Sequence, residues 1–220
     1  MTFWSILRES HAAFLAGLST TVRLCLIVWF TSLFLGSGLG IAASRSWIMR
    51  AGLGGVSALF AGVPALVVLF WLYYPGQAIL GVDVSPFSTA ALALSMIGIV
   101  FVAESILRSI EEVPSQYALA GAVAGLSRQD VLRYVTVPLI LNSFVPRLLV
   151  TFVSLFQMTF FAAFISVDEL FRAAQRVNAI VYRPVEIYTA LALFCMAVSL
   201  PLYATAAWLR KRTRNMLSEL

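Results

Sequence analysis

Charged residues are sparse in this chain, and they separate long apolar runs. The uncharged runs lie between successive charged positions: Arg23 and Arg45, Arg50 and Asp83, Asp83 and Glu104, Arg147 and Asp168, and Glu186 and Arg210. Each run can hold about 20 apolar residues, which is the length of one helical membrane span. The pattern therefore predicts an all-α integral membrane protein with five transmembrane helices, formed by a single domain over residues 1–220.

The second run is long for one helix. An exit near Tyr74 is offered by three turn-forming residues, Pro75, Gly76 and Gly81. We therefore expect this span near residues 53–74. Ahead of the first span, residues 3–14 predict a short amphipathic helix at the membrane interface, with an apolar side formed by Phe3, Trp4, Leu7 and Phe14. The same stretch lacks a basic start and a cleavage site, so we expect no removable signal peptide.

Composition supports the membrane class. Hydrophobic residues make up 61% and charged residues 11% of the 220 residues, and the mean hydropathy is +0.93. Soluble domains carry about 25% charged residues. In a soluble protein the net charge of +5 would suggest a nucleic-acid partner. Here the basic residues flank apolar runs, so we assign them to membrane topology and expect the lipid bilayer, and not nucleic acid, as the partner.

The basic residues also predict which side each loop faces. Most lie on one side of the predicted spans: Arg45, Arg50, Arg108, Arg128, Arg133, Arg147, Arg210, Lys211, Arg212 and Arg214. The other side carries fewer, namely Arg8, Arg172, Arg176 and Arg183. The positive-inside rule then places the N-terminus outside and the C-terminus in the cytoplasm. Three acidic residues lie near the outer arginines and are expected to pair with them: Asp168, Glu169 and Glu186.

Residues 113–139, between the third and fourth spans, are unlike the apolar runs around them and are expected in the cytoplasm. Pro114 suits the first turn of a helix, and small side chains follow it at Ala118, Ala120, Gly121, Ala122 and Ala124. Gly125 can adopt the left-handed conformation that ends a helix. Ser127 then predicts the cap of a second helix, with Asp130 as its capping-box partner.

Pro138 is expected to break this second helix before the next span begins. Two interpretations of residues 113–139 remain open from the residues alone. The segment is either a helical hairpin that only links two spans, or a surface on which a partner docks. A surface with little side-chain bulk favours docking, because it allows a partner to approach the backbone closely.

The segment resembles the EAA loop of ABC importer permeases, in the polar amino acid uptake branch (histidine, glutamine and arginine types). Within the loop the matching residues are Gly125-Leu126-Ser127 and Val137-Pro138. Further matches extend over nearly the whole chain: Leu18–Val22, Phe60–Leu66, Ala103-Glu104 with Arg108, Val113-Pro114, Val167–Leu170, Ala174-Gln175 and Arg183-Pro184. The resemblance implies the type I ABC importer fold in a bacterial cytoplasmic membrane.

The resemblance also implies a function and three partners. The chain would be the permease subunit that moves an amino acid or related small polar solute into the cytoplasm. Its partners would be a cytoplasmic ABC ATPase dimer, a second permease subunit in a homo- or heterodimer, and an extracytoplasmic solute-binding protein. A coupling helix near residues 115–126 would contact the ATPase, and the coupling positions would be Ala120, Gly121, Gly125, Leu126 and Pro138.

Several positions depart from the family pattern. The loop's usual Glu falls on Leu119, and its second Ala falls on Gly121. The Arg and Thr of the family's FRGTP stretch fall on Ala61 and Val63, and a polar stretch in its fourth core helix appears here as Gln157–Phe160. These replacements disfavour a charged substrate. They also leave an alternative function, a non-transporting membrane partner subunit that retained the permease fold.

Motifs for chemistry are missing from the sequence. No GxxxxGK[ST] stretch occurs, so we expect no enzyme activity, and ATP hydrolysis is assigned to another subunit. Cys25 and Cys195 lie in apolar runs and His11 has no ligand partners at suitable spacing, so we expect no disulfide, metal or cofactor. Three closely spaced glycines are assigned to helix packing or helix flexibility rather than to a nucleotide loop: Gly36, Gly38 and Gly40.

Candidates for a substrate pathway come from the family stretches and from polar residues inside predicted spans, which default to functional roles. They are Val63, Pro64, Glu104, Gln157 and Thr159. For Glu104 we favour a simpler interpretation, an ion pair with Arg108 at the cytoplasmic end of its span. Gln157 and Thr159 fit interhelical hydrogen bonding equally well. Arg147, beside Pro146, is expected at the membrane interface.

Overall fold

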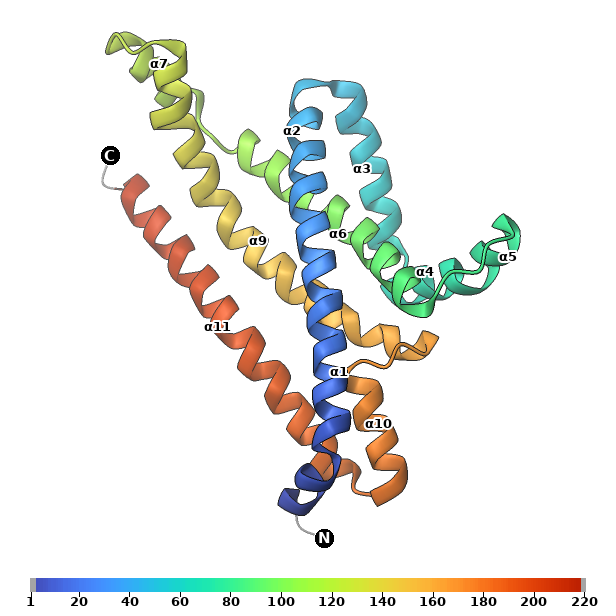
Figure 1. Ribbon diagram of the computed structural model, residues 1–220. Helices are drawn as coiled ribbons and strands as arrows, with labels where there is room; N and C mark the ends of the chain where they lie inside the picture. The colour runs from blue at the N-terminus through green and yellow to red at the C-terminus, as the bar shows by residue number, and fades with distance from the viewer. Residues whose placement is uncertain (1–2, 219–220) are drawn as a thin grey trace.

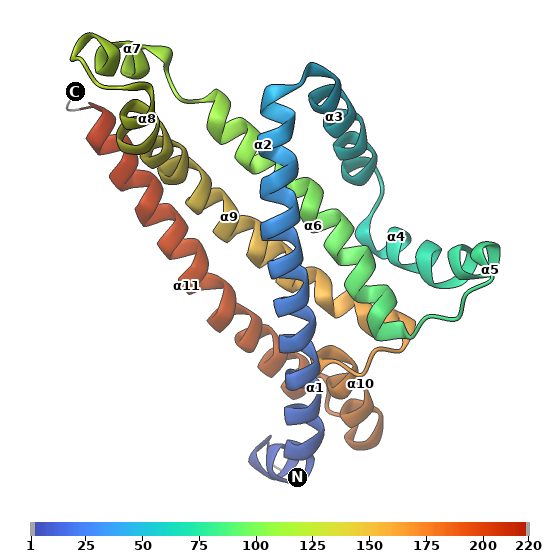
Figure 2. The same cartoon turned by 45° about the horizontal axis from the view of Figure 1, so that its top comes forward.

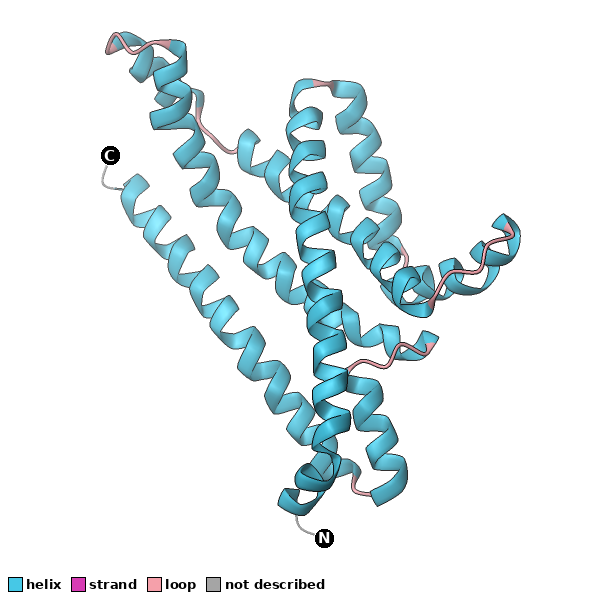
Figure 3. Cartoon of the chain, in the orientation of Figure 1, coloured by secondary structure: helices cyan, strands magenta, loops and turns pink. Residues whose placement is uncertain are grey.

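The computed structural model describes residues 3–218, and the side chains of residues 10–117 and 119–213. Every regular element in that range is a helix, as predicted from the apolar runs (Figure 3). The long helices run side by side along the molecule, and the two ends of the chain lie at opposite ends of it (Figure 1). Within residues 3–218, four helices are long and apolar enough to cross a membrane, and a bent pair makes a fifth candidate.

The first span is a single continuous helix that begins earlier than predicted. It consists of α1, a π-helical turn and α2, with bounds Phe3–Thr31, Ser32–Gly36 and Ser37–Arg45. The expected separate helix over residues 3–14 is wrong in this respect, because no proline or cap interrupts α1 and the stretch runs directly into the span. Phe14 packs against Ala174, Val177 and Ile187. The side chains of Phe3, Trp4 and Leu7 lie outside those described.

The second apolar run does not form one straight span. It consists of α3, α4, a π-helical turn and α5, with bounds Trp47–Gly62, Ala65–Trp71, Leu72–Gly76 and Gln77–Leu80. The two halves are bent by 96°. The predicted single helix over residues 53–74 is therefore wrong. Pro64 disfavours the helical conformation at the residue before it, and Val63 is extended, with φ −107° and ψ 122°.

The predicted exit near Tyr74 is also wrong. The helical path continues through Pro75 by means of the wider π-helical turn. It ends at Gly81, which takes the left-handed conformation with φ +65°. The chain then enters α6 (Pro86–Glu111), whose first turn is capped by the Ser85 hydroxyl, which accepts from the Ser88 N–H at 3.2 Å.

The core of the molecule lies along α6. Over its most apolar 18 residues, 61% of the residues are buried inside the protein. The corresponding share for the last span, Pro184–Thr213, is 11%. Leu94 of α6 is buried with Leu24 of α1 and Leu155 of α9 in the largest cluster. Close contact with the first span occurs at Gly36 and Gly40, where an added Cβ would lie under 3 Å from α6 atoms. This confirms the packing role predicted for those two glycines, whereas Gly38 faces open space.

After α6 come α7 (Ser115–Val123) and a long continuous helix. The latter joins α8, a π-helical turn, α9 and a 3₁₀ segment, with bounds Arg128–Asp130, Val131–Thr136, Val137–Thr159 and Phe160–Ile165. The expected break at Pro138 is wrong. Pro138 lies in the first turn of α9, directly after the π-helical turn, so the helix passes it without ending. The fourth span consequently begins well before Arg147.

The last part of the chain contains one predicted and one unpredicted helix. α11 (Pro184–Ser218) is the expected final span. α10 (Leu170–Val181) forms in the loop before it and packs against α1 and α11 through Ala174, Val177 and Ile187. α10 lies at the same end of the molecule as the N-terminus, whereas α7 and the end of α11 lie at the other (Figure 2).

Candidate functional site

Residues 113–139 fold locally as a helix, a glycine turn and a second helix. Val113 and Pro114 leave the α6 axis, and α7 begins at Ser115. Gly125 is left-handed with φ +82°, and the Leu126 N–H closes the turn by donating to Gly121 O at 3.1 Å. The Ser127 hydroxyl accepts from the Asp130 N–H at 3.2 Å and donates to its carboxylate at 2.6 Å. The predicted turn and cap are confirmed. The role of the segment as a coupling loop stays a prediction.

The outer surface of this segment is apolar and uncovered. Leu119, Val123 and Leu126 are 64%, 89% and 42% exposed. Gly121 faces inward, because a Cβ there would lie 3.0 Å from Val131 Cγ2 of the following helix. Ala120 is exposed. The small residues thus have two roles. Gly121 allows the two helices of the hairpin to come into contact, and Ala120 adds little side-chain bulk to the exposed surface.

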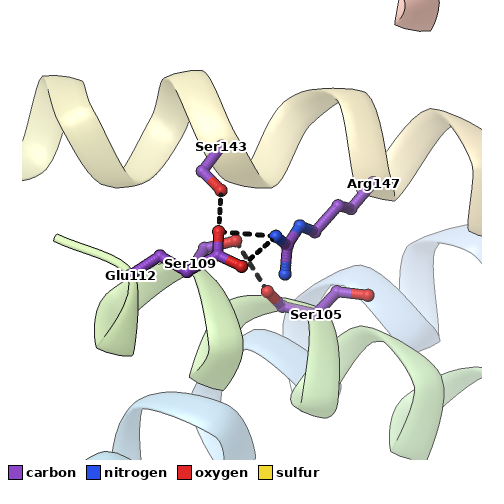
Figure 4. A network of polar contacts seen from close by, with 5 residues as sticks. All are labelled: Ser105, Ser109, Glu112, Ser143 and Arg147. Atoms are coloured by element: carbon purple, nitrogen blue, oxygen red, sulfur yellow. Dashed lines mark hydrogen bonds and ion pairs between the residues drawn. The ribbon is translucent and has the colours of Figure 1, made fainter. Parts of the chain in front are cut away.

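Two consecutive glutamates at the end of α6 tie the base of this segment to two other helices. Glu111 pairs with Arg50 of α3 at 2.8 Å. Glu112 pairs with Arg147 of α9 and accepts a hydrogen bond from the Ser143 hydroxyl at 2.8 Å (Figure 4). The hydrogen bond from Arg147 is the main reason that the pKa of Glu112 lies below its ordinary value. Sequence reasoning placed Arg147 at the interface but gave no sign of this partner, 35 residues away.

Two cavities lie beside this ion pair, between α6, α9 and α11. The larger, of about 400 Å³, is lined by polar residues that include Ser109, Glu112, Asn142, Ser143 and Thr213. The smaller, of about 330 Å³, is lined by residues that include Glu104, Ser105, Arg108, Thr151 and Ser154. Arg147 and Arg210 line both. The arrangement offers carboxylate, hydroxyl and guanidinium groups to a small polar molecule.

The five candidate pathway residues are not brought together by the described structure. Glu104 lines the smaller cavity and forms the expected ion pair with Arg108, at 3.7 Å. Val63 and Pro64 lie at the bend between α3 and α4. The other two face different ways on α9. The pathway role of all five stays a prediction.

On α9, Gln157 is exposed and Thr159 is fully buried. The Thr159 hydroxyl donates to Phe156 O of its own helix at 2.7 Å, and the Cys25 thiol lies 3.9 Å from it. Neither Gln157 nor Thr159 lines the two cavities. The Gln157 side chain therefore lies on the outer surface of the chain, and the Thr159 side chain lies in the packed core.

At the opposite end of the molecule, α10 is fixed by a buried carboxylate. Glu169 is 0% exposed and accepts from the Phe171 and Arg172 N–H groups, each at 2.8 Å. The Thr21 hydroxyl of α1 accepts from the Leu170 N–H at 3.1 Å. Burial raises the pKa of Glu169 to about 7. The sequence predicted ion pairing for this glutamate, and the structure instead shows a helix cap.

The ion pairs expected for the outer arginines are otherwise confirmed. Asp168 pairs with both Arg172 and Arg176, at 3.3 and 2.9 Å. Arg183 pairs with Glu186 at 2.8 Å. These contacts lie within or next to α10 and at the start of α11, so they stiffen this end of the molecule.

Comparison with known proteins places these features in a family. The family described as binding-protein-dependent transport system inner membrane component matches residues 32–215. The chain is similar to the L-cystine transport system permease protein TcyB of Bacillus subtilis, with 38% identity over 56% of this chain and 52% of that protein. The chain thus aligns with about half the length of that relative.

Two other relatives align over more of their length. The glutamine transport system permease protein GlnP of Escherichia coli K12 is 27% identical over 70% of each chain. The glutamate/aspartate import permease protein GltK of Escherichia coli O6:H1 is 25% identical over 96% of this chain and 97% of that one. Both comparisons extend the similarity beyond the region shared with TcyB.

Solved structures share the fold. A crystal structure of an amino acid ABC transporter with histidines superposes with a TM-score of 0.81, at 22% identity, over 96% of this chain and 99% of that one. An inward-facing conformation of the MetNI methionine ABC transporter gives a TM-score of 0.71, at 16% identity, over 92% and 97%. The fold of this chain, over at least 92% of its length, is therefore one seen in solved ABC transporters.

Proposed function

The chain belongs to the family of binding-protein-dependent transport system inner membrane components, and from this premise we propose that it is the permease subunit of an ABC importer for an amino acid or related small polar solute. It is a multi-pass inner-membrane protein and not an enzyme. ATP hydrolysis is performed by a separate ATPase subunit. The substrate class rests on relatives named for cystine, glutamine and glutamate/aspartate transport.

The permease crosses the membrane five times, with its N-terminus outside and its C-terminus in the cytoplasm. Four spans are continuous helices, and the bent α3–α4 pair supplies the fifth crossing. That pair leads from the end of the molecule where α2 stops to the end where α6 begins, and the two chain ends lie at opposite ends (Figure 1). The basic residues gather at the end that carries α7, which supports the cytoplasmic assignment of that end.

The ATPase docks on residues 113–139, hereafter the docking segment. The observation that carries this proposal is the uncovered apolar surface of Leu119, Val123 and Leu126 on a hairpin held rigid by its glycine turn and serine cap. Exposed apolar patches of this kind mark interaction sites. The surface projects at the end of the molecule that the positive-inside rule places in the cytoplasm. Ala120, Gly121, Gly125, Leu126 and Pro138 are the proposed coupling positions.

The transport complex contains three further kinds of subunit. An ATPase dimer contacts the docking segment, a second permease completes a homo- or heterodimer, and an extracytoplasmic binding protein delivers the solute to the end that carries α10. Gln157 is the proposed contact of α9 with the second permease or with the solute pathway, which its exposure supports. Glu104, with its cavity, and the bend at Val63 and Pro64 form the remaining part of the proposed pathway.

Reconstitution tests this function directly. The chain is co-expressed with its ATPase, any second permease and its binding protein, placed in proteoliposomes, and given ATP inside. Uptake of L-cystine, L-glutamine, L-arginine and L-glutamate is then measured. Binding-protein-dependent uptake of one of them is the expected result. A stable complex that hydrolyses ATP but moves none of them would favour the alternative, a membrane partner without a transport role.

A further inference from the structure

The paired glutamates at the end of α6 contact two helices that face different sides of it. Consecutive helical residues point about 100° apart, because a turn contains about 3.6 residues. Glu111 therefore reaches Arg50 of α3, and Glu112 reaches Arg147 and Ser143 of α9 (Figure 4). The docking segment begins at the next residue. The ion pairs thus lie at the root of the segment and not on its exposed surface.

We propose that Glu111 and Glu112, with Arg50 and Arg147, form a two-armed ionic clamp that makes the root of the docking segment move as one body with α3, α6 and α9. These four are positioning residues for the coupling between ATPase and spans. The inference rests on the proposed function, because it assigns a role within ATP-driven transport. It assigns nothing to the ATPase-binding surface itself.

The need for a clamp follows from how the segment joins the spans. Its far end continues without interruption into α9 through the helix Arg128–Ile165. Its near end leaves α6 through Val113 and the extended Pro114, where no helical ladder continues. Because α7 packs on this helix where Gly121 meets Val131, a force on α7 is transmitted to α9, whereas the connection of α7 to α6 is the extended Pro114. The Glu112–Arg147 pair closes this gap by joining α6 to α9 directly.

Apolar packing alone does not supply the same constraint. Ile106 of α6 and Phe144 of α9 already pack together near the pair. Packed apolar helices can slide past one another by small shear movements, whereas a charged pair with a hydroxyl partner fixes the register between them. The second arm, Glu111 to Arg50, extends the same constraint to α3 and hence to the bend at Pro64.

The clamp contributes little to folding, which makes its role testable. Glu112 and Arg147 side chains are 53% and 32% exposed, and pairs so open to solvent add little stability. Loss of either arm is therefore expected to leave the complex assembled and to lower only the transmission of movement. A positioning role therefore predicts an assembled complex with a lower response to the binding protein, whereas a structural role predicts loss of assembly.

The test uses the reconstituted complex of this chain with its ATPase, second permease and binding protein. ATP hydrolysis is measured with and without binding protein, with L-cystine and L-glutamine as probes, for Glu111→Gln and Glu112→Gln. The matched control is Arg212→Gln, which removes a charge near the C-terminal end of α11, where Arg212 lies over the Trp208 ring, outside the clamp and outside the docking segment. We expect the stimulated-to-basal ratio to fall by up to about five-fold in the clamp variants and to be unchanged in the control.

Two rescue measurements complete the design. Exchanging the charges with Glu112→Arg and Arg147→Glu together is expected to restore the ratio. Separately, Glu112→Cys and Arg147→Cys are combined with Cys25→Ser and Cys195→Ser, and the two new thiols are bridged by a short bifunctional methanethiosulfonate. Before bridging, the stimulated-to-basal ratio of ATP hydrolysis is expected to be low. After bridging, the same preparation is expected to recover the wild-type ratio.

The results distinguish this inference from the proposed function. If the bridged protein hydrolyses ATP without stimulation, or the unbridged protein is fully stimulated, the clamp is wrong while the permease function stands. An unchanged ratio in both glutamine variants overturns the clamp in the same way. If the wild-type chain binds no ATPase at all, the proposed function itself fails, and the clamp fails with it.

Discussion

Gly40 of α2 lies directly against Ala103 of α6. A Cβ at residue 40 would be 2.5 Å from the Ala103 carbonyl oxygen and 1.9 Å from Ile106 Cγ2. The first span and α6 therefore meet backbone to backbone at this point. In a membrane, where lipid is as apolar as leucine, such close packing of small residues is a principal source of helix association.

Gly40→Ala is expected to destabilise the protein, because the added methyl would overlap the Ile106 side chain and would also lie 2.5 Å from the Ala103 carbonyl oxygen, which is backbone and cannot turn aside. Forcing extra atoms into a packed core costs about 1–3 kcal/mol. Gly38→Ala is the matched control, since residue 38 lies in the same helix with open space around it. Thermal unfolding in detergent is expected to show a lower midpoint for the first variant only. Equal midpoints would mean that α2 and α6 are farther apart than described.

Stability is expected to depend on the protonation of Glu169. Its folded-state pKa of about 7 lies above the ordinary value of 4.5, because burial disfavours the charged form. Between these two pH values the folded protein holds a proton that the unfolded chain releases. The stabilisation of the folded state by protonated Glu169 is therefore fully present below about pH 4.5 and is lost as the pH rises through 7.

Glu169→Gln removes this dependence and keeps one side-chain acceptor for the start of α10. The free energy of unfolding is measured for the wild type and for the variant between pH 4.5 and 8, and the variant's value is subtracted from the wild-type value at each pH. We expect the difference to fall with rising pH by at most about 3 kcal/mol, since one pKa unit corresponds to about 1.4 kcal/mol. A difference that stays constant across this range would show that Glu169 is ionised throughout.

The docking segment was predictable because its signals are local. Gly125 ends one helix and Ser127 caps the next, and both act on residues within one turn of themselves. The apolar runs likewise located four of the spans, since burial in lipid acts on each helix separately. Their ends were less predictable: α1 and the helix around Pro138 continue past the points where charge or proline suggested a stop.

What the sequence could not reveal depends on tertiary contacts. Glu169 and its neighbour Asp168 are both acidic residues before a helix, and only packing against α1 buries one and leaves the other exposed. Glu112 and Arg147 are brought together by the packing of α6 against α9. The bend lies at Pro64, but the sequence prediction placed the end of the helix near Tyr74, because Pro75, Gly76 and Gly81 cluster there.

Membrane orientation is expected to place residues 123 and 180 on opposite sides. Val123 of α7 and Ile180 of α10 are 89% and 80% exposed and lie at opposite ends of the molecule. After Cys25→Ser and Cys195→Ser, either Val123→Cys or Ile180→Cys is introduced, and the chain is expressed without the ATPase that would cover residue 123 and is treated with a membrane-impermeant maleimide. We expect labelling at residue 180 in spheroplasts, and at residue 123 only after permeabilisation. The reverse pattern would invert the proposed topology.

The central claim is that the docking segment binds the ATPase, and two left-handed glycines allow it to be tested most directly. Gly125 and Gly81 have φ of +82° and +65° and open space around them. Aspartate strains the backbone similarly at both positions, but only residue 125 lies in the docking segment. The measurement is the amount of ATPase that co-purifies with Gly125→Asp and with Gly81→Asp.

The account predicts that Gly125→Asp lowers ATPase recovery by about ten-fold, equivalent to about 1.4 kcal/mol of binding free energy, while Gly81→Asp recovers as much as wild type. Equal recovery with both variants would contradict it.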